Sequence, residues 1–157
     1  MNSVRSSIYP DSTLRPGESQ KRARELFRSG VEGTALNWWA PGEPLPSEES
    51  FVLVGVVVWS GYDMNLLDLL NDAVVSTPDR ELTAYVFDAD LIRSEAEFEA
   101  IFPGLGLAHH TPMVGYWKGG ALLETGCGYL GRQIVARLFG IDDSLVLKRV
   151  SFVPIAR

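Results

Sequence analysis

The sequence predicts an α/β fold in one domain. A chain of 157 residues, 46% of them hydrophobic, is long enough to bury one core and too apolar for general disorder. Residues 51–59 form an almost continuous apolar run, which is typical of a central strand covered on both faces. Strand-like and helix-like segments then alternate along the chain. Together these observations favour a sheet flanked by helices.

The N-terminal part divides into an arm and a helix. Residues 1–17 contain Ser, Pro, Asp, Arg and Gly without an apolar period, so we expect an irregular arm. The domain itself is expected over residues 18–140. It begins with a short amphipathic helix at Glu18–Ser29, whose apolar residues recur at helical spacing and which Gly30 ends.

A proline-rich segment separates this helix from the central strand. Residues 38–50 contain three prolines, so we expect a loop. The loop begins with two adjacent tryptophans, Trp38 and Trp39. At least one of them is expected to pack onto the domain, and the alternative is an exposed aromatic anchor for another protein.

The middle of the chain follows a strand–helix–strand–helix order. The strand Phe51–Trp59 is followed by a leucine-rich helix that ends at Thr77-Pro78. A second strand is expected at Glu81–Asp88. A second helix follows at Ser94–Phe102, with Ser94 and Glu97 forming a capping box at its start.

The last part of the domain predicts a hairpin and a helix. Met113–Trp117 and Ala121–Thr125 flank a Lys-Gly-Gly turn, which indicates a β-hairpin. A helix with Leu130 and Phe139 on its apolar face follows and stops at Gly140. Residues 141–157 are expected to be an extension in which Leu145–Val153 adds an edge strand.

Three local motifs resemble those of the thioredoxin-like superfamily, and the resemblance spans residues 18–140. Trp59 precedes a four-residue segment and a helix, where thioredoxins have Trp-Cys-x-x-Cys. His109-His110-Thr111-Pro112 looks like the cis-proline loop of the family, and Thr125-Gly126 is similar to its groove glycine. The resemblance implies a three-layer fold with a central mixed sheet.

The positions that match the two cysteines are Ser60 and Asp63. A serine hydroxyl cannot replace the thiolate that attacks a disulfide. The two residues instead form a capping box, in which Ser60 accepts from the Asp63 N–H and the Asp63 carboxylate reaches back to the Ser60 N–H. The family also buries an acid in its central strand, where this chain has Val54 or Gly55. We therefore expect a redox-inactive protein that is not an enzyme.

The favoured function is a thioredoxin-like protein-binding module: an adaptor, assembly factor or chaperone. An extended peptide or protein would pair with the cis-proline loop and contact apolar side chains around it. The residues expected to line this groove are Trp59, Ser60, Tyr62, Asp63, Thr111, Pro112, Met113 and Gly126.

Four alternatives stay open. The chain could be a structural subunit that contacts a complex through its N- and C-terminal extensions. It could be a glutathione-binding enzyme that uses Ser60 or Tyr62, as the resemblance to glutathione transferases implies. His109 and His110 could ligate a metal with Asp63, although adjacent side chains of an extended segment point apart. Cys127 could be reactive, but single cysteines are more often inert. We expect no cofactor and no metal.

Charge and composition limit the partners and the compartment. A net charge of −6 makes nucleic acid an unfavourable partner. A single cysteine and the absence of an early apolar stretch indicate the cytoplasm. Residues 51–59 are too short to span a bilayer, so no membrane association is expected. The C-terminal strand could pair two copies into a homodimer.

Overall fold

The computed structural model describes residues 16–105 and 110–147, with side chains from residue 24 onward. It contains five α-helices, one 3-10 helix and five strands in this part of the chain. In chain order these are α1 (Pro16–Glu32), β1 (Asn37–Trp38), β2 (Ser50–Val56), α2 (Gly61–Ser76), β3 (Thr83–Asp88), η2 (Ala89–Leu91), α3 (Glu95–Ile101), β4 (Met113–Lys118), β5 (Ala121–Cys127), α4 (Tyr129–Phe139) and α5 (Asp143–Val146).

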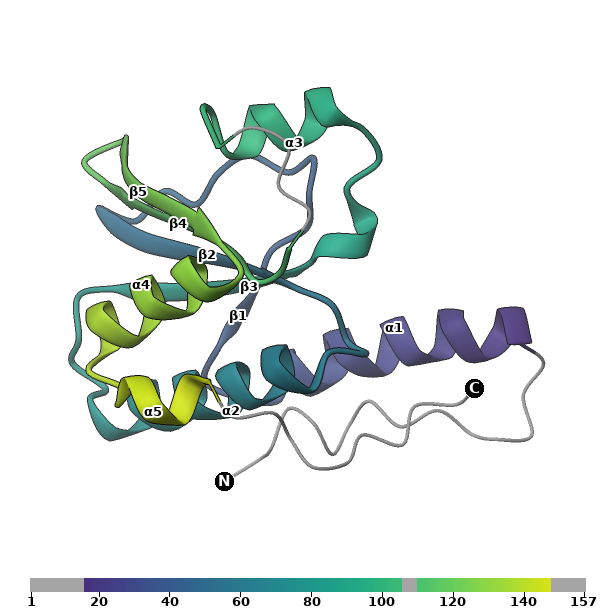
Figure 1. Cartoon of the computed structure of the whole chain (residues 1–157), viewed down its shortest axis with the longest axis horizontal. Helices are drawn as coiled ribbons and strands as arrows, with labels where there is room; N and C mark the ends of the chain where they lie inside the picture. Colours follow the sequence, from purple (N-terminus) through teal and green to yellow (C-terminus); the bar gives the residue numbers. More distant parts are fainter. Residues whose placement is uncertain (1–15, 106–109, 148–157) are drawn as a thin grey trace.

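The strands form one mixed sheet in the order β1-β3-β2-β4-β5 (Figure 1). β3 pairs in parallel with both β1 and β2, whereas β4 is antiparallel to β2 and β5. β2 lies at the centre, and all of its residues from Phe51 to Val56 are buried. The continuous apolar run therefore forms the middle of the sheet, as predicted.

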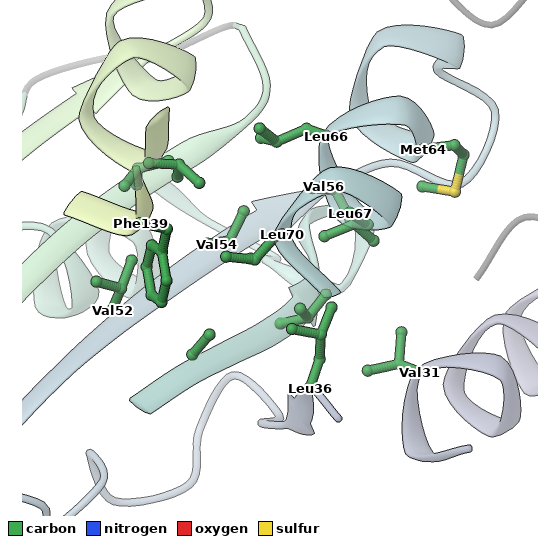
Figure 2. Packing of buried hydrophobic residues seen from close by; sticks show 14 of the residues in the cluster. Val31, Leu36, Val52, Val54, Val56, Met64, Leu66, Leu67, Leu70 and Phe139 are labelled. Atoms are coloured by element: carbon green, nitrogen blue, oxygen red, sulfur yellow. The ribbon is translucent and has the colours of Figure 1, made fainter. Parts of the chain in front are cut away.

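Helices cover the two faces of the sheet unequally. In Figure 1, α3 lies above the sheet, and α1, α2, α4 and α5 lie below it. Figure 2 shows the lower core, where side chains from β2 meet side chains from α2 and α4. The labelled members from these elements are Val52, Val54, Val56, Met64, Leu66, Leu67, Leu70 and Phe139.

Aromatic side chains fill the opposite face. Phe87 and Trp117 occupy the space that side chains at Gly55 and Gly115 would otherwise take. A Cβ at Gly55 would lie 2.2 Å from the Phe87 ring, and one at Gly115 would lie 2.5 Å from the Trp117 ring. Trp39 packs edge-on to Phe87, with 5.5 Å between ring centroids. These two faces complete the predicted three layers.

The tryptophan segment differs from the prediction of a loop. Trp38 belongs to the two-residue strand β1, which pairs with β3, and its ring packs against Phe27 of α1. Trp39 is buried on the other face, and its Nε1–H donates to the Pro44 carbonyl at 2.9 Å. The packing interpretation is confirmed for both residues, because successive side chains of a strand point to opposite faces.

The first helix is longer than predicted. α1 begins at Pro16, a residue type favoured at the first helical position, and runs through Gly30 to Glu32. Gly30 therefore does not end it. Phe27 and Val31, one turn apart, are both fully buried, and this packing carries the helix past the glycine. The remainder of the predicted arm, residues 1–15, lies outside the described residues.

The prediction of a C-terminal strand from Leu145 is wrong for the residues that the structure describes. Residues 143–146 form α5, so Leu145 belongs to a helix and not to a strand. The Asp142 side chain accepts from the Ser144 N–H at the start of α5, and Val146 is buried in the core below the sheet. These local and tertiary contacts favour a helical turn. The remainder of the predicted strand, residues 148–153, lies outside the described part of the chain.

Candidate functional site

The candidate site lies where β2 ends and α2 begins. Trp59 stands between them with 62% of its surface exposed. Ser60 is the N-cap of α2, and its side chain accepts from the Asp63 N–H at 3.3 Å. The Ser60 N–H donates to the Val57 carbonyl at 3.1 Å. The first half of the predicted capping box is therefore confirmed.

The second half of the capping box is wrong. The Asp63 carboxylate is completely buried, and its Oδ2 accepts from the backbone N–H of Val57 at 3.1 Å instead of turning back to Ser60. Its Oδ1 makes no hydrogen bond of normal geometry among the described residues. Asp63 thus links the first turn of α2 to the end of β2 and does not accept a hydrogen bond from the Ser60 N–H.

Burial dominates the electrostatics of Asp63. Loss of solvent raises the pKa of its carboxyl group from 3.8 to about 6. The Thr111 hydroxyl, the Val57 N–H, the Arg132 guanidinium and Ser60 each lower the pKa by a smaller amount. The Thr111 hydroxyl makes no hydrogen bond of normal length and angle to Oδ1. It therefore lowers the pKa of Asp63 as a neighbouring dipole. A negative charge on Asp63 was expected to be stabilised by the helix dipole. Burial instead makes ionisation of this carboxyl group costly.

The predicted cis-proline loop is confirmed. The Thr111–Pro112 peptide bond is cis. The Pro112 carbonyl accepts from the Gly128 N–H at 3.0 Å, which joins the loop to the start of α4. A Cβ at Gly131 would lie 2.7 Å from that same carbonyl oxygen, so only glycine lets α4 approach so closely. The loop is held against α4 by backbone contacts.

Met113 lies in β4 directly after the cis-proline loop, and Gly126 lies in β5 against α4. Met113 is half-buried and pairs with Gly55 on one side and Cys127 on the other. Gly126 is buried, and a Cβ there would lie 3.2 Å from Leu130 and Ile134 of α4. Gly126 therefore allows α4 to pack on β5 and does not line an open surface.

Exposed apolar side chains surround the loop. Tyr62 is 40% exposed, and the Arg132 guanidinium lies 5.3 Å from its ring centroid. Tyr129 and Leu130, at the start of α4, are also exposed. Leu130 was predicted on the apolar face of its helix, but most of its surface is exposed. The sequence offered one signal for these two residues: they follow the matched groove glycine.

Polar groups at the neighbouring strand end complete the site. The Trp59 Nε1–H donates to Asp90 Oδ2 at 3.4 Å. Asp88 is buried, and its side chain accepts from the Asp90 N–H at 2.9 Å. Burial raises the pKa of the Asp88 carboxyl group, with a smaller upward contribution from the charge of Asp90. Two buried carboxyl groups, Asp63 and Asp88, thus lie at the carboxyl ends of neighbouring parallel strands.

The structure describes only some of the residues that the metal and thiol alternatives need. Within residues 16–105 and 110–147, no three His, Cys, Asp or Glu side chains gather as they would around a metal ion. His110 is exposed, and His109 lies outside the described residues. Cys127 is free and half-buried at the end of β5.

In the described residues, no helix has both the length and the apolar character that crossing a bilayer requires.

Comparison with known proteins yields structural likeness only. No protein-family model matches the chain, and no curated protein matches it. Among solved structures, it is similar to a thioredoxin of Fasciola hepatica, with 17% identity and a TM-score of 0.41 over 57% of this chain and 81% of the thioredoxin. Thioredoxin O2 of Arabidopsis thaliana, in its oxidised state, has 18% identity and a TM-score of 0.39, covering 59% and 76% of the two chains. A mutant thioredoxin of Halobacterium salinarum has 9% identity and a TM-score of 0.40, covering 68% and 94%.

The topology itself identifies the fold. A central β2 runs into α2, β3 lies parallel beside it, and a cis-proline precedes the β4–β5 hairpin and α4. This mixed sheet with helices on both faces is a thioredoxin-like α/β fold.

Proposed function

We propose that the protein is a redox-inactive binding module that takes an extended polypeptide segment beside the Thr111–Pro112 loop. The observation that supports this most is the exposure of Trp59 and Tyr62 next to a helix start where Ser60 Oγ and Asp63 Oδ2 accept internal hydrogen bonds. Exposed aromatic side chains are typical anchors for a protein partner.

The chemistry at positions 60 and 63 supports binding rather than disulfide exchange. Ser60 serves as a helix cap, and Asp63 is a buried acid that holds the end of β2. The chain has one cysteine, Cys127, so it cannot close an internal disulfide. Positions 60 and 63 therefore supply neither an attacking nor a resolving thiol for disulfide exchange.

The backbone beside the proline supports an extended ligand. Among the described residues, no backbone hydrogen bond joins the N–H or C=O of Thr111 to another residue. These two groups suit pairing with an extended chain, which supplies one donor and one acceptor at alternate residues. Trp59 and Tyr62 would then contact the side chains of that segment. An adaptor, assembly factor or chaperone in the cytoplasm would use such a site.

The proposal can be tested by comparing partner capture. Trp59→Ala/Tyr62→Ala is expected to lose partners that the wild type retains, while its circular dichroism stays native. Val75→Ala removes an apolar side chain of similar exposure, 43%, from the far end of α2 and is the matched control. It should retain every partner.

Other outcomes would replace the proposal. Identical partners on the wild type and the double variant would place binding on the N- and C-terminal extensions, as in a structural subunit. Saturable binding of glutathione that is lost in Ser60→Ala or Tyr62→Phe would favour a glutathione-dependent enzyme instead.

A further inference from the structure

The outer edge of β5 carries an open hollow that the proposed peptide site does not use. Among the described strands, β5 pairs only with β4, so one of its edges presents unpaired backbone groups. A hollow of about 710 Å³ lies beside this edge, between β5, α4 and the start of α5. Its lining includes Glu124, Leu130, Ile134, Arg137, Ile141 and Asp143.

The hollow combines apolar surface with acidic groups. Leu130 and Ile134 provide apolar side chains from α4, and Ile141 provides one from the segment between α4 and α5. Glu124 and Asp143 provide carboxylates, of which Glu124 is paired with Arg137. A strand added to β5 would therefore suit this face best if it placed apolar side chains on the hollow and carried basic residues nearby.

The last ten residues of the chain have this composition. Residues 148–157 read Lys-Arg-Val-Ser-Phe-Val-Pro-Ile-Ala-Arg, with three cationic and no anionic side chains. Since the whole chain has a net charge of −6, the other 147 residues carry −9. Val150 and Phe152 are two positions apart and would share one face of a strand, while Pro154 would end it. The segment complements the rest of the molecule in both charge and pattern.

The course of α5 favours a second copy as the source of this segment. Asp143, at the start of α5, lines the hollow, whereas near its end the Leu145 carbonyl accepts from Asn65 of α2 at 2.8 Å and Val146 is buried. The chain thus passes from the hollow toward α2, beside which α5 lies (Figure 1). To pair with β5 of its own molecule, the segment after residue 147 would have to turn back toward the hollow. The same segment of a neighbouring molecule could reach β5 without turning back.

We propose that residues 148–157 of one copy add as a further strand to the outer edge of β5 of a second copy, with Val150 and Phe152 over the hollow. Exchange in both directions forms a closed, two-fold symmetric dimer. This surface is separate from the Trp59 and Tyr62 site, so the dimer does not depend on the proposed function.

The test uses the full chain in sedimentation velocity over a concentration series, together with amide hydrogen exchange of residues 121–127. The wild type is expected to sediment as a dimer with protected β5 amides. Phe152→Asp should be a monomer in which these amides exchange on the order of tenfold faster or more, because their pairing is lost. Phe152→Leu keeps an apolar side chain and should stay a dimer. An excess of synthetic peptide 148–157 should convert the wild type to monomers while β5 stays protected.

Three results would overturn the proposal. A wild type that is monomeric with rapidly exchanging β5 amides would leave the edge unoccupied. A monomer whose β5 protection disappears in Phe152→Asp would show that the segment folds onto its own chain. A dimer that is unaffected by Phe152→Asp and by the peptide would use another surface.

Discussion

The Asp63 carboxylate accepts a 3.1 Å hydrogen bond from the backbone N–H of Val57, across the turn that joins β2 to α2. This bond places an acid in the core at a helix start, where a charge would gain from the helix dipole but loses its solvent. The pKa of Asp63 is raised because desolvation outweighs the neighbouring polar groups and the charge of Arg132. The turn is therefore held by a group whose charged form is costly at neutral pH.

The stability of the protein should fall as the pH rises from about 4 to about 6. The folded state binds a proton at Asp63 up to a pKa of about 6, whereas the unfolded state releases it near 3.8. The stabilisation is complete below the lower value, is lost through this window and then levels off. The loss attributable to Asp63 is roughly 3 kcal/mol at most, from about two pKa units. Urea unfolding at a series of pH values measures it.

Asp63→Asn isolates this contribution. The amide oxygen can still accept from Val57, but the group cannot ionise, so the variant should lose most of the slope and exceed the wild type in stability above pH 6. The pKa of Asp88 is also raised, so Asp88→Asn should remove a separate part of the slope and leave that of Asp63. A wild type whose stability is constant or rises across the window would contradict the burial argument.

Ser60 should contribute to stability as a helix cap and not as a nucleophile. Ser60→Ala removes the acceptor for the Asp63 N–H and should lower the free energy of unfolding by about 0.5–2 kcal/mol. Ser94→Ala removes the equivalent bond to the Glu97 N–H at the more exposed start of α3 and is the matched comparison. We expect the larger loss at Ser60, because the N–H left without a partner is less accessible to water. Equal stability of Ser60→Ala and wild type would refute the capping role.

Gly131→Ala should disturb the cis-proline loop. The new Cβ would lie 2.7 Å from the Pro112 carbonyl oxygen, and a backbone atom cannot move aside as a flexible side chain can. We expect a loss on the order of 1–3 kcal/mol and changed amide chemical shifts around residues 111–113. Gln133→Ala, two residues along α4, tests the helix without this contact and should leave these shifts unchanged. If both variants behave alike, close packing of α4 on the loop is not needed.

The two tryptophans Trp39 and Trp59 should respond oppositely to removal. Trp39 is 4% exposed and packs on Phe87, so Trp39→Ala should cost about 3–5 kcal/mol. Trp59 is 62% exposed, so Trp59→Ala should change the stability by less than about 0.5 kcal/mol. Chemical denaturation compares them directly. A large loss at Trp59 would make it a structural residue and weaken its proposed role in binding.

Several features could be predicted because neighbouring residues along the chain encode them. The buried strand β2, the Ser60 and Ser94 caps and the glycine stop at Gly140 each follow from a few contiguous side chains. The turn at Gly119 and Gly120, where both φ angles are positive, is of the same kind. The cis-proline was predicted from its likeness to a known loop.

Other features depend on residues that are far apart in the sequence. β1 is only two residues long and exists because Asn37 and Trp38 pair with Tyr85 and Val86 of β3. No local pattern of two residues can indicate such a strand. The continuation of α1 past Gly30 likewise depends on burial of Val31 in the distant core.

The sequence by itself determined which segments become strands and helices through the middle of the domain, and which residues replace the two cysteines. Only the tertiary structure decided what those replacements do. Residues 57, 111 and 132 converge on Asp63 and bury it, so a residue that was predicted to close a capping box becomes a buried acid. The physical reason is that hydrogen-bond caps act over one helical turn, whereas desolvation is set by all the segments that pack around a group.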